Sequence, residues 1–434
     1  MNVRNLRNSA RQSGFTMVEL MIGVLIGLVA IVVMFQVFAV AESQKRTTAG
    51  TGDAQQEGVS SLYLMERDAR MAGYGMNYFP LLGCNVWGYW NPSGKVFNFT
   101  LAPAVITHNA ANVPDKLRLA YANVDTMAFP AGIGAPNSTD KTPGYVWLER
   151  DPTQFKTGDL FIAGEVPVSP NPMKDCSLFQ ATFLDFTKNA VRFSDLFYVD
   201  DGTLVTYPAK YTPPTASAGT QVAPHNPFYA YWTNATSSGG RVMDIGNDPT
   251  VVEYSVVNNQ LVAKNVLNPD DTGVVVADNI VQFKAQYGWA YWDNTGTNPC
   301  ALNPTVLTPC RINPSNAIYS ARIVPGTPQD QWADDLPASP YVMQPNDWRR
   351  IIAVRFIIVA RSGNKERKSQ TTGLCTATTV MPKWVVNNTT IDVSNTGDPD
   401  WGCYRYKTFE TVVPIRNLMW FPDPNGATGG TAAS

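Results

Sequence analysis

The stretch Ser13-Gly14-Phe15-Thr16-Met17-Val18-Glu19, followed by the apolar run from Leu20 to Ala41, decides the fold of this chain. The run holds 22 consecutive residues without a charged side chain. An α-helix rises about 1.5 Å per residue, so a helix of this length crosses the hydrocarbon core of a membrane, roughly 30 Å thick. The residues before it carry Arg4, Arg7 and Arg11 and no acid, which predicts that they stay on the cytoplasmic side.

Glu19 places a carboxylate at the head of this run. An ionisable group inside a membrane segment costs up to roughly 2.5–3.5 kcal/mol on insertion scales, and it marks a functional position by default. A buried carboxylate needs either a proton or a positively charged partner. Glu19 is therefore a candidate functional residue.

Three interpretations of this N-terminus compete. The first is a membrane anchor that is never cut. The second is a secretory signal cut after Ala39-Val40-Ala41, before Glu42, although the apolar run exceeds the 7–15 residues of an ordinary signal core. The third, which we favour, rests on a resemblance: Gly14-Phe15-Thr16-Met17-Val18-Glu19 resembles the processing motif of type IV prepilins, with Ser13 where a basic residue is commoner.

The prepilin resemblance implies roles for three residues. A prepilin peptidase would cut after Gly14, the new N-terminal Phe15 would be methylated, and the apolar helix would be kept. Glu19 would pair with the freed amine of Phe15, its own or a neighbour's, and so set the axial register of a subunit entering a filament. A side chain at position 14 would block the peptidase.

Length and composition predict a large body after the helix. The chain has 434 residues and a formal net charge of −2, which gives no basic excess to attract nucleic acid. Its 32 Gly, 32 Pro, 18 Tyr, 19 Phe and 11 Trp residues favour a β-rich body with many loops.

Six cysteines lie beyond the apolar run, and an even number there fits disulfides in an oxidising compartment. Fifteen pairings are formally open. We favour the pairs Cys84–Cys176, Cys300–Cys310 and Cys375–Cys403, because the last two join sequence neighbours and close short loops.

The helix is expected to continue past the membrane to about residue 71, with a weak point at Thr47 to Gly52, where glycines disfavour helix. An apolar stripe follows at helical spacing, with charged residues on the other faces, and Gly73-Tyr74-Gly75 ends the helix. The stripe is Gly58, Leu62, Met65, Ala69 and Ala72; the charged residues are Glu57, Glu66, Arg67, Asp68 and Arg70.

The rest of the chain reads as strands and loops, so the predicted fold class is α+β: a long N-terminal helix, membrane-spanning in its first half, packed on a mostly antiparallel sheet with disulfide-bearing loops. Expected strands include a hairpin over Val251 to Ala263 with its turn at Asn258-Asn259, a half-buried strand over 281–289 and a central strand over 351–360. A further strand is expected over 409–417, with Pro414 pushing its end toward a sheet edge or a bulge. Residues 80–152 and 291–347 look like loop-rich insertions.

The sequence supports no catalytic or metal-binding constellation, and we expect no enzyme activity, cofactor or metal. His108 and His225 lie in loop sequences and are interpreted as surface residues or as loop histidines satisfied by hydrogen bonds. Asp270-Asp271 and Asp398-Asp400 suit turns, with calcium binding as the weaker alternative. The basic segment Arg361 to Lys368 reads as a solvated loop rather than a DNA contact.

A wider resemblance joins these pieces. Arg67-Asp68-Ala69-Arg70-Met71-Ala72-Gly73-Tyr74-Gly75, the segments 158–190, 251–289 and 349–363, and the closing Val412-Val413-Pro414-Ile415-Arg416-Asn417 are similar to PilW-type minor pilins. This implies a type IV pilus subunit that joins other minor pilins in a tip complex priming assembly, with adhesion and twitching motility as consequences. A J-type pseudopilin of type II secretion and a secreted β-rich adhesin or glycan-binding protein are the alternatives.

The resemblance also implies an organisation and a set of partners. The expected parts are a leader (1–14), a membrane and filament-core helix (15–41), an amphipathic second half (42–75), a periplasmic β-rich head (76–423) and a disordered tail (424–434). The expected partners are the prepilin peptidase, other minor pilins, the major pilin, the inner-membrane assembly platform and a possible tip adhesin. The chain would sit in the inner membrane first and in the pilus on the cell surface later.

Overall fold

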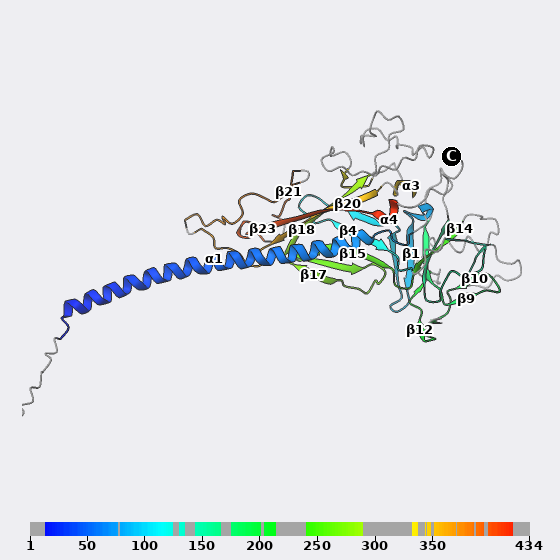
Figure 1. Ribbon diagram of the computed structural model, residues 1–434, viewed down its shortest axis with the longest axis horizontal. Helices are drawn as coiled ribbons and strands as arrows, with labels where there is room; N and C mark the ends of the chain where they lie inside the picture. The colour runs from blue at the N-terminus through cyan, green and yellow to red at the C-terminus, as the bar shows by residue number, and fades with distance from the viewer. Residues whose placement is uncertain are drawn as a thin grey trace, which may run out of the picture.

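One long helix projects from a β-rich head in the computed structural model (Figure 1). The helix, α1 (Met17–Met71), has 55 residues and ends where Ala72 leaves the helical conformation. The structure describes residues 14–76, 79–124, 130–134, 144–165, 175–200, 204–213, 240–289, 332–336, 343, 345–348, 351–369, 371–385, 388–394 and 398–419. The second half of α1 lies along the head, while the first half extends away from it.

The helix runs unbroken through the weak point predicted at Thr47 to Gly52. Gly50 is buried there against Ser362: a Cβ built on Gly50 would lie 3.0 Å from the Cβ of Ser362. Tertiary contact with the head therefore accompanies helical structure that the local sequence disfavours.

Two sheets pack against the second half of α1. A four-stranded sheet, in the order β19-β18-β20-β23, consists of β18 (Ile280–Trp289), β19 (Trp332–Ala333), β20 (Ile351–Arg361) and β23 (Tyr406–Pro414). A five-stranded sheet, in the order β17-β16-β15-β4-β3, consists of β3 (Ala104–Thr107), β4 (Lys116–Tyr121), β15 (Thr250–Val257), β16 (Gln260–Asn265) and β17 (Val274–Asp278).

A third, larger sheet lies beyond the end of α1, in the order β13-β1-β8-β7-β14-β5 with β2 on β1. Its strands are β1 (Asn85–Trp90), β2 (Lys95–Thr100), β5 (Ala131–Gly132), β7 (Leu160–Glu165), β8 (Cys176–Gln180), β13 (Tyr211–Thr212) and β14 (Gly240–Gly246). Strands β1 and β8 run parallel, whereas the other named strand pairs of the described residues are antiparallel. The predicted α+β class is confirmed.

Small elements complete the head. They are β6 (Tyr145–Trp147), β10 (Ala190–Arg192) and β9 (Phe183–Asp185) in one sheet, β11 (Phe197–Val199) with β12 (Thr206–Pro208), and β21 (Lys383–Trp384) with β22 (Thr389–Thr390). The short helices are η1 (Phe79–Leu81), α3 (Pro345–Trp348), η3 (Trp401–Cys403) and α4 (Arg416–Met419).

Several strand predictions are confirmed. Asn258 and Asn259 both have positive φ, 51° and 60°, as a two-residue hairpin turn between β15 and β16 requires. Strand β20 is central and its apolar residues are buried on both faces. Strand β23 lies at the sheet edge as expected, but it spans Tyr406–Pro414 rather than 409–417, because the chain leaves the sheet at Pro414.

The prediction of a loop-rich insertion over 80–152 is wrong. Besides β4, whose residues 116–121 form an apolar run that we expected to be a strand, β1, β2 and β3 lie in this range, and Val86 and Phe99 are buried in the main core. The many aromatic residues, which we took for loop composition, favour strands because they pack well on a pleated surface. The second proposed insertion, 291–347, lies largely outside the described residues, and the tail 424–434 lies wholly outside them.

The main core forms where α1 meets the two sheets. Met65, Ala69 and Ala72 of α1 are fully buried there, together with Phe283, Tyr287 and Phe356 of the four-stranded sheet. Small side chains on the helix let the sheet approach closely. The helix is thus part of the hydrophobic core of the head.

Candidate functional site

The N-terminus of α1 carries a reciprocal cap. Thr16 precedes the helix in an extended conformation, and its hydroxyl accepts a hydrogen bond from the Glu19 backbone N–H at 3.3 Å. The Glu19 carboxylate in turn accepts a long bond, 3.5 Å, from the Thr16 backbone N–H. This is a capping box, which satisfies two helix-terminal donors. The spacing Thr-x-x-Glu before an apolar run is a recognisable signal for such a cap, but it was not among our predictions.

Apolar side chains of the first half of α1 are not covered by any of the described residues. Phe15 is 84% exposed, and each large apolar side chain from Met17 to Val40 is more than half exposed. By length and composition this is a helix able to cross a membrane. The Ala39 to Ala41 tripeptide lies inside the same unbroken helix.

The second half of α1 meets the four-stranded sheet at a glycine. The ring of Phe409, from β23, packs against Gly58, where a Cβ would lie 2.0 Å from the ring atom Cε2. Any larger residue at position 58 would have to displace this ring. Gly58 therefore sets how closely the helix approaches β23.

Asp68 joins α1 to the five-stranded sheet. Its carboxylate is 5% exposed and accepts hydrogen bonds from the hydroxyls of Tyr254 at 2.7 Å and Tyr121 at 3.4 Å, and from Arg67 at 3.1 Å. Burial, with the Asp68 hydrogen bond, raises the pKa of Tyr254, so this hydroxyl stays protonated and donates. We had placed Asp68 on an outer face of the helix, and that prediction is wrong.

The C-terminus of α1 is capped from the far end of the chain. The side-chain amide of Asn417 donates to the carbonyl oxygens of Met71 and Ala72, both at 3.1 Å, and of Arg70 at 3.4 Å. Gly73 follows with φ of +80°, a conformation that favours glycine. Segments at opposite ends of the sequence thus fix this end of the helix.

Two family models match parts of the chain. Residues 9–35 match the prokaryotic N-terminal methylation motif, and residues 250–417 match the type IV pilus-assembly protein W. These matches support a PilW-type, prepilin-like minor pilin. No curated protein and no solved structure matches the chain.

The PilW match covers a part of the head that contacts α1. It runs from β15 to α4 and includes Tyr254, Phe409 and Asn417, which contact the helix at three separate points. The resemblance that we noted over 251–289, 349–363 and 412–417 falls within it. The resemblance over 158–190 falls outside both matches and stays a prediction.

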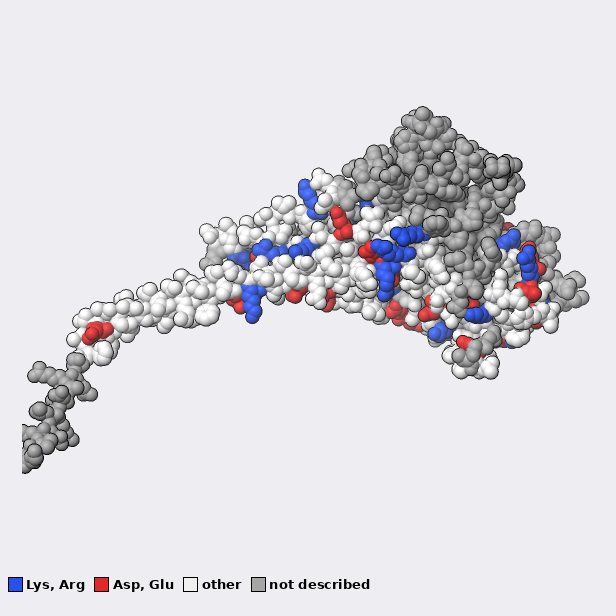
Figure 2. All heavy atoms as spheres, in the orientation of Figure 1, with Lys and Arg blue, Asp and Glu red and all other residues white. Residues whose placement is uncertain are grey.

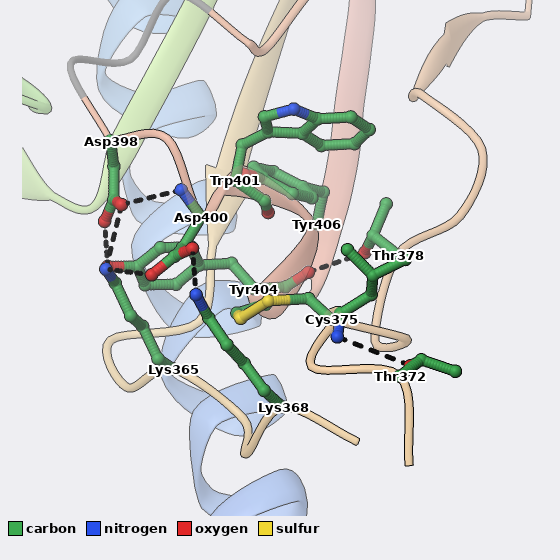
Figure 3. Close-up of a disulfide and its surroundings, with 12 residues drawn as sticks. Lys365, Lys368, Thr372, Cys375, Thr378, Asp398, Asp400, Trp401, Tyr404 and Tyr406 are labelled. Carbon is green, nitrogen blue, oxygen red and sulfur yellow. Dashed lines mark hydrogen bonds and ion pairs between the residues drawn. A yellow bond between two sulfur atoms is a disulfide. The ribbon is translucent and has the colours of Figure 1, made fainter. Parts of the chain in front are cut away.

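Disulfides link Cys84 to Cys176 and Cys375 to Cys403. These are two of the three pairs that we favoured from the sequence; Cys300 and Cys310 lie outside the described residues. The first bridge lies beside the only parallel strand pair of the described sheets, β1 and β8, and crosslinks it. The second ties the loop after β20 to η3 (Figure 3).

Ion pairs surround the second disulfide (Figure 3). Lys365 bonds Asp398 at 2.8 Å and Asp400 at 3.4 Å, and Lys368 lies 2.7 Å from Asp400. The Lys365 ammonium, helped by the Asp400 backbone N–H, lowers the pKa of Asp398 to about 2. The Asp398-Asp400 segment, for which calcium was the weaker alternative, is thus engaged with lysines. Cys375 and Cys403 lie close to Asp400, but as a disulfide they offer no thiolate to a metal.

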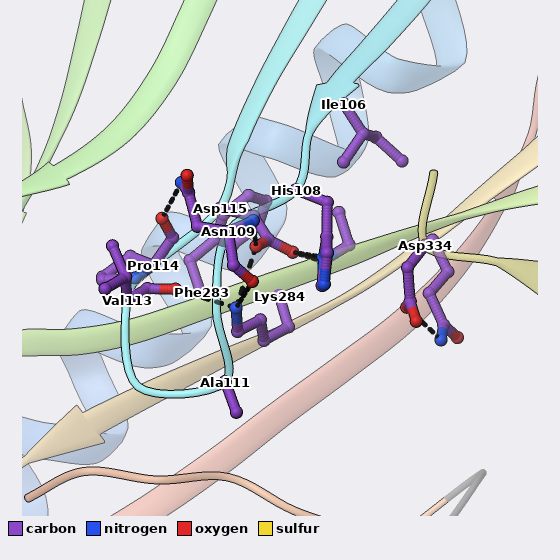
Figure 4. Close-up of polar contacts among 12 residues, drawn as sticks. Ile106, His108, Asn109, Ala111, Val113, Pro114, Asp115, Phe283, Lys284 and Asp334 are labelled. Atoms are coloured by element: carbon purple, nitrogen blue, oxygen red, sulfur yellow. Dashed lines mark hydrogen bonds and ion pairs between the residues drawn. The ribbon is translucent and has the colours of Figure 1, made fainter. Parts of the chain in front are cut away.

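The buried ammonium of Lys284 lies on the face of the four-stranded sheet that points away from α1 (Figure 4). Lys284, on β18, donates to the carbonyls of Asn109, Ala110 and Val113 at 2.8–3.0 Å and to Asp115 at 2.9 Å. We expected β18 to be half-buried, yet Gln282, Lys284 and Gln286 are all buried. Polar and apolar side chains do alternate along β18, but the polar face is covered by the loop between β3 and β4, about 170 residues away in sequence.

His108 belongs to the same cluster. Its Nδ1 lies 3.2 Å from the Asp115 carboxylate, which also accepts the backbone N–H groups of Asn109 and Ala285. A carboxylate with this many donors and a lysine partner has a structural role. His225 lies outside the described residues.

Arg355 is a second buried cation in the region matched by PilW. Its Nε donates to Gln286 at 2.6 Å, and its guanidinium lies 4.5 Å from the ring centre of Trp332 and 5.3 Å from that of Trp384. Burial lowers its pKa to about 10, so it remains charged at neutral pH. The two aromatic faces stabilise the charge in place of water.

Proposed function

We propose that this chain is a minor pilin of a type IV pilus. In this proposal the prepilin peptidase cuts after Gly14, Phe15 is methylated, and the helix over 15–41 holds the chain in the inner membrane with the head in the periplasm. The chain then enters the pilus with other minor pilins and the major pilin. The observation that carries the proposal is that α1 is uncovered in its first half and forms part of the head's core in its second half.

The uncovered first half of α1 is suited first to the lipid of the membrane and then to contact with other pilin helices. Side chains that no part of the described chain covers need lipid or neighbouring helices, because exposed apolar surface costs roughly 25 cal/mol per Å² in water. Lipid would cover them before assembly and other pilin helices afterwards. A secretory cut after Ala41 would discard this surface and would have to occur within an unbroken helix.

The capping box supports a role for Glu19 in assembly. In the cut chain Phe15 becomes the N-terminal residue, directly before Thr16, whose N–H already contacts the Glu19 carboxylate. The carboxylate is therefore held near the new amine, its own or that of a neighbouring subunit. We propose that this pairing sets the register of the entering subunit.

Within the pilus we place this chain in a minor-pilin complex at the tip that primes assembly and can carry an adhesin. The size of the head and the PilW match support this place. Adhesion and twitching motility would depend on it indirectly. The fold and the family suggest a structural role rather than catalysis.

N-terminal sequencing of the mature protein tests the proposal. A methylated Phe15 is expected, whereas Glu42 at the N-terminus would overturn it in favour of a secreted protein. Gly14→Val should give a heavier, uncut precursor that stays in the membrane.

Glu19 is tested separately from cleavage. Glu19→Ala should be cut normally but enter pili at least tenfold less than the native chain, while Glu19→Asp, which keeps the charge, should be less impaired. Normal incorporation of Glu19→Ala would overturn the register role. Recovery of the chain with type II secretion components instead of pilins would favour the pseudopilin.

A further inference from the structure

We propose that the head carries a basic surface for anionic phospholipid headgroups at the point where α1 enters it. We call it the junction patch and define it by three segments: 42–46 of α1, 361–368 after β20, and 398–407 around η3. The proposal rests on the membrane anchoring in the proposed function and adds a contact between the head and the lipid.

The three segments are held together by direct contacts. Thr47 of α1 donates to Glu366 at 3.2 Å, and Glu366 is also bound by Arg405. Ser362 packs on Gly50, and Lys407 lies 3.3 Å from Gln55 of α1. The Cys375–Cys403 disulfide anchors the end of the basic loop to η3.

The patch has a strong positive excess. It contains eight basic side chains, Lys45, Arg46, Arg361, Lys365, Arg367, Lys368, Arg405 and Lys407, and four acidic ones, Glu42, Glu366, Asp398 and Asp400. The whole chain, in contrast, has a net charge of −2. Figure 2 shows basic side chains gathered on the head where α1 emerges from it.

Four cations of the patch, Lys45, Arg361, Arg367 and Lys407, form no ion pair with an acid among the described residues, and two of them are also exposed. Lys45 and Arg367 are exposed, and neither forms an ion pair there. Arg361 lies 4.2 Å from the centre of the Tyr404 ring and Lys407 bonds Gln55, and both are half-buried, whereas the remaining four basic groups pair with acids, for example Arg46 with Glu42 at 3.0 Å. Lys45 and Arg367 are therefore the groups best placed to bind an external anion.

The position of the patch selects a lipid surface as the partner. The apolar run ends at Ala41, and Thr47, which bonds the loop, follows six residues later, about 9 Å farther along the helix. Headgroups extend roughly 5–7 Å beyond the hydrocarbon on each side, and charge interactions persist for a Debye length of about 8 Å at physiological salt. An upright helix thus brings the patch to the headgroups.

The test uses the full-length chain reconstituted in vesicles. A fluorescent amino acid replaces Asn364, an exposed residue of the loop, and a headgroup-spin-labelled lipid quenches it when the loop is near the membrane surface. Vesicles contain phosphatidylcholine alone or with added phosphatidylglycerol. We expect at least threefold stronger quenching with phosphatidylglycerol, and a loss of this difference in high salt.

Variants separate charge from fold. Lys45→Glu with Arg367→Glu should reduce the quenching to the level in phosphatidylcholine, whereas Lys45→Arg with Arg367→Lys should keep it. Arg150→Glu with Lys210→Glu, which reverses two exposed charges outside the patch, is the matched control and should have no effect.

Equal quenching in both kinds of vesicle, or quenching insensitive to the charge reversal, would overturn the lipid contact. Loss of pilus incorporation in the charge-reversed variant without any lipid effect would assign the patch to a protein partner and also overturn it. Membrane insertion and cleavage after Gly14 are measured on the same chain, so a failure of the proposed function is seen separately.

Discussion

Asp68 shows how one buried carboxylate can fix a helix to a sheet. It accepts hydrogen bonds from the hydroxyls of two tyrosines, Tyr254 on β15 and Tyr121 on β4, while Arg67 supplies a positive charge at the surface. A buried charge is tolerated only with such partners. The residue therefore specifies the rotation of α1 about its own axis as it lies on the head.

Replacing Asp68 should destabilise the head. Asp68→Ala leaves the Tyr254 hydroxyl buried without an acceptor and removes hydrogen bonds to a charged group, so we expect a loss of about 2–4 kcal/mol in the free energy of unfolding. Urea unfolding of the detergent-solubilised chain measures this. Glu66→Ala, which removes an exposed pair with Arg70 on the same helix, should change stability by less than about 1 kcal/mol. Equal effects would mean that the tyrosine bonds contribute little.

At the scale of elements, the approach of α1 to β23 depends on one glycine. Inside a helix, replacing glycine with alanine normally stabilises by up to about 1 kcal/mol. At Gly58 the added Cβ would meet Phe409, and an overpacked contact costs roughly 1–3 kcal/mol, so the sign should reverse.

Gly52 provides the matched comparison, because nothing lies within 4 Å of a Cβ built there. Gly52→Ala should raise the melting temperature and Gly58→Ala should lower it, as measured by circular dichroism. Adding Phe409→Leu to Gly58→Ala should restore part of the lost melting temperature. A stabilising Gly58→Ala would show that the helix and β23 are less closely packed than described.

The ion pairs beside the Cys375–Cys403 disulfide should make the basic loop sensitive to acid. The pKa of Asp398 is lowered to about 2, so its contribution to stability is present above about pH 4 and is lost as the pH falls through 2. Lys365, whose pKa is raised by Asp398, would lose its contribution only at strongly alkaline pH.

Limited digestion with pepsin tests this acid sensitivity. Cleavage at the exposed Leu374, in the same loop, should increase between pH 4 and pH 2 relative to cleavage in the hairpin of β11 and β12. Asp398→Asn should remove the difference, because the loop would be equally open at both pH values. An unchanged difference in this variant would assign the sensitivity to another group.

For the whole molecule, the two described disulfides should differ in what they contribute. The bridge between Cys84 and Cys176 closes a segment with a sequence separation of 92, and the bridge between Cys375 and Cys403 one of 28. On the chain-entropy account each is worth about 2–5 kcal/mol, and more for the longer segment. The Cys84→Ala/Cys176→Ala variant should therefore unfold at lower denaturant than Cys375→Ala/Cys403→Ala; the reverse order would show that native-state strain or residual structure dominates.

The parts of this molecule that could be predicted are those set by nearby residues. The unbroken apolar run gave α1, Asn258-Asn259 gave the hairpin turn, and two apolar faces gave the central strand β20. The burial of Asp68 and Lys284 could not be predicted, because their partners lie 186 and about 170 positions away in sequence. The spacing of residues within one element does not reveal such distant partners. Both looked like ordinary solvent-facing charges in their own elements.

The continuity of α1 has a mechanical consequence. A tension applied along the helix from its N-terminal end reaches the head without passing through any hinge or linker. It would load the contacts at Gly58, Asp68 and Asn417 together, as sliding between the helix and the sheets, rather than peeling them apart one after another. Sliding requires many bonds to fail at once, so the attachment of the head to α1 should resist force along the helix axis better than force across it.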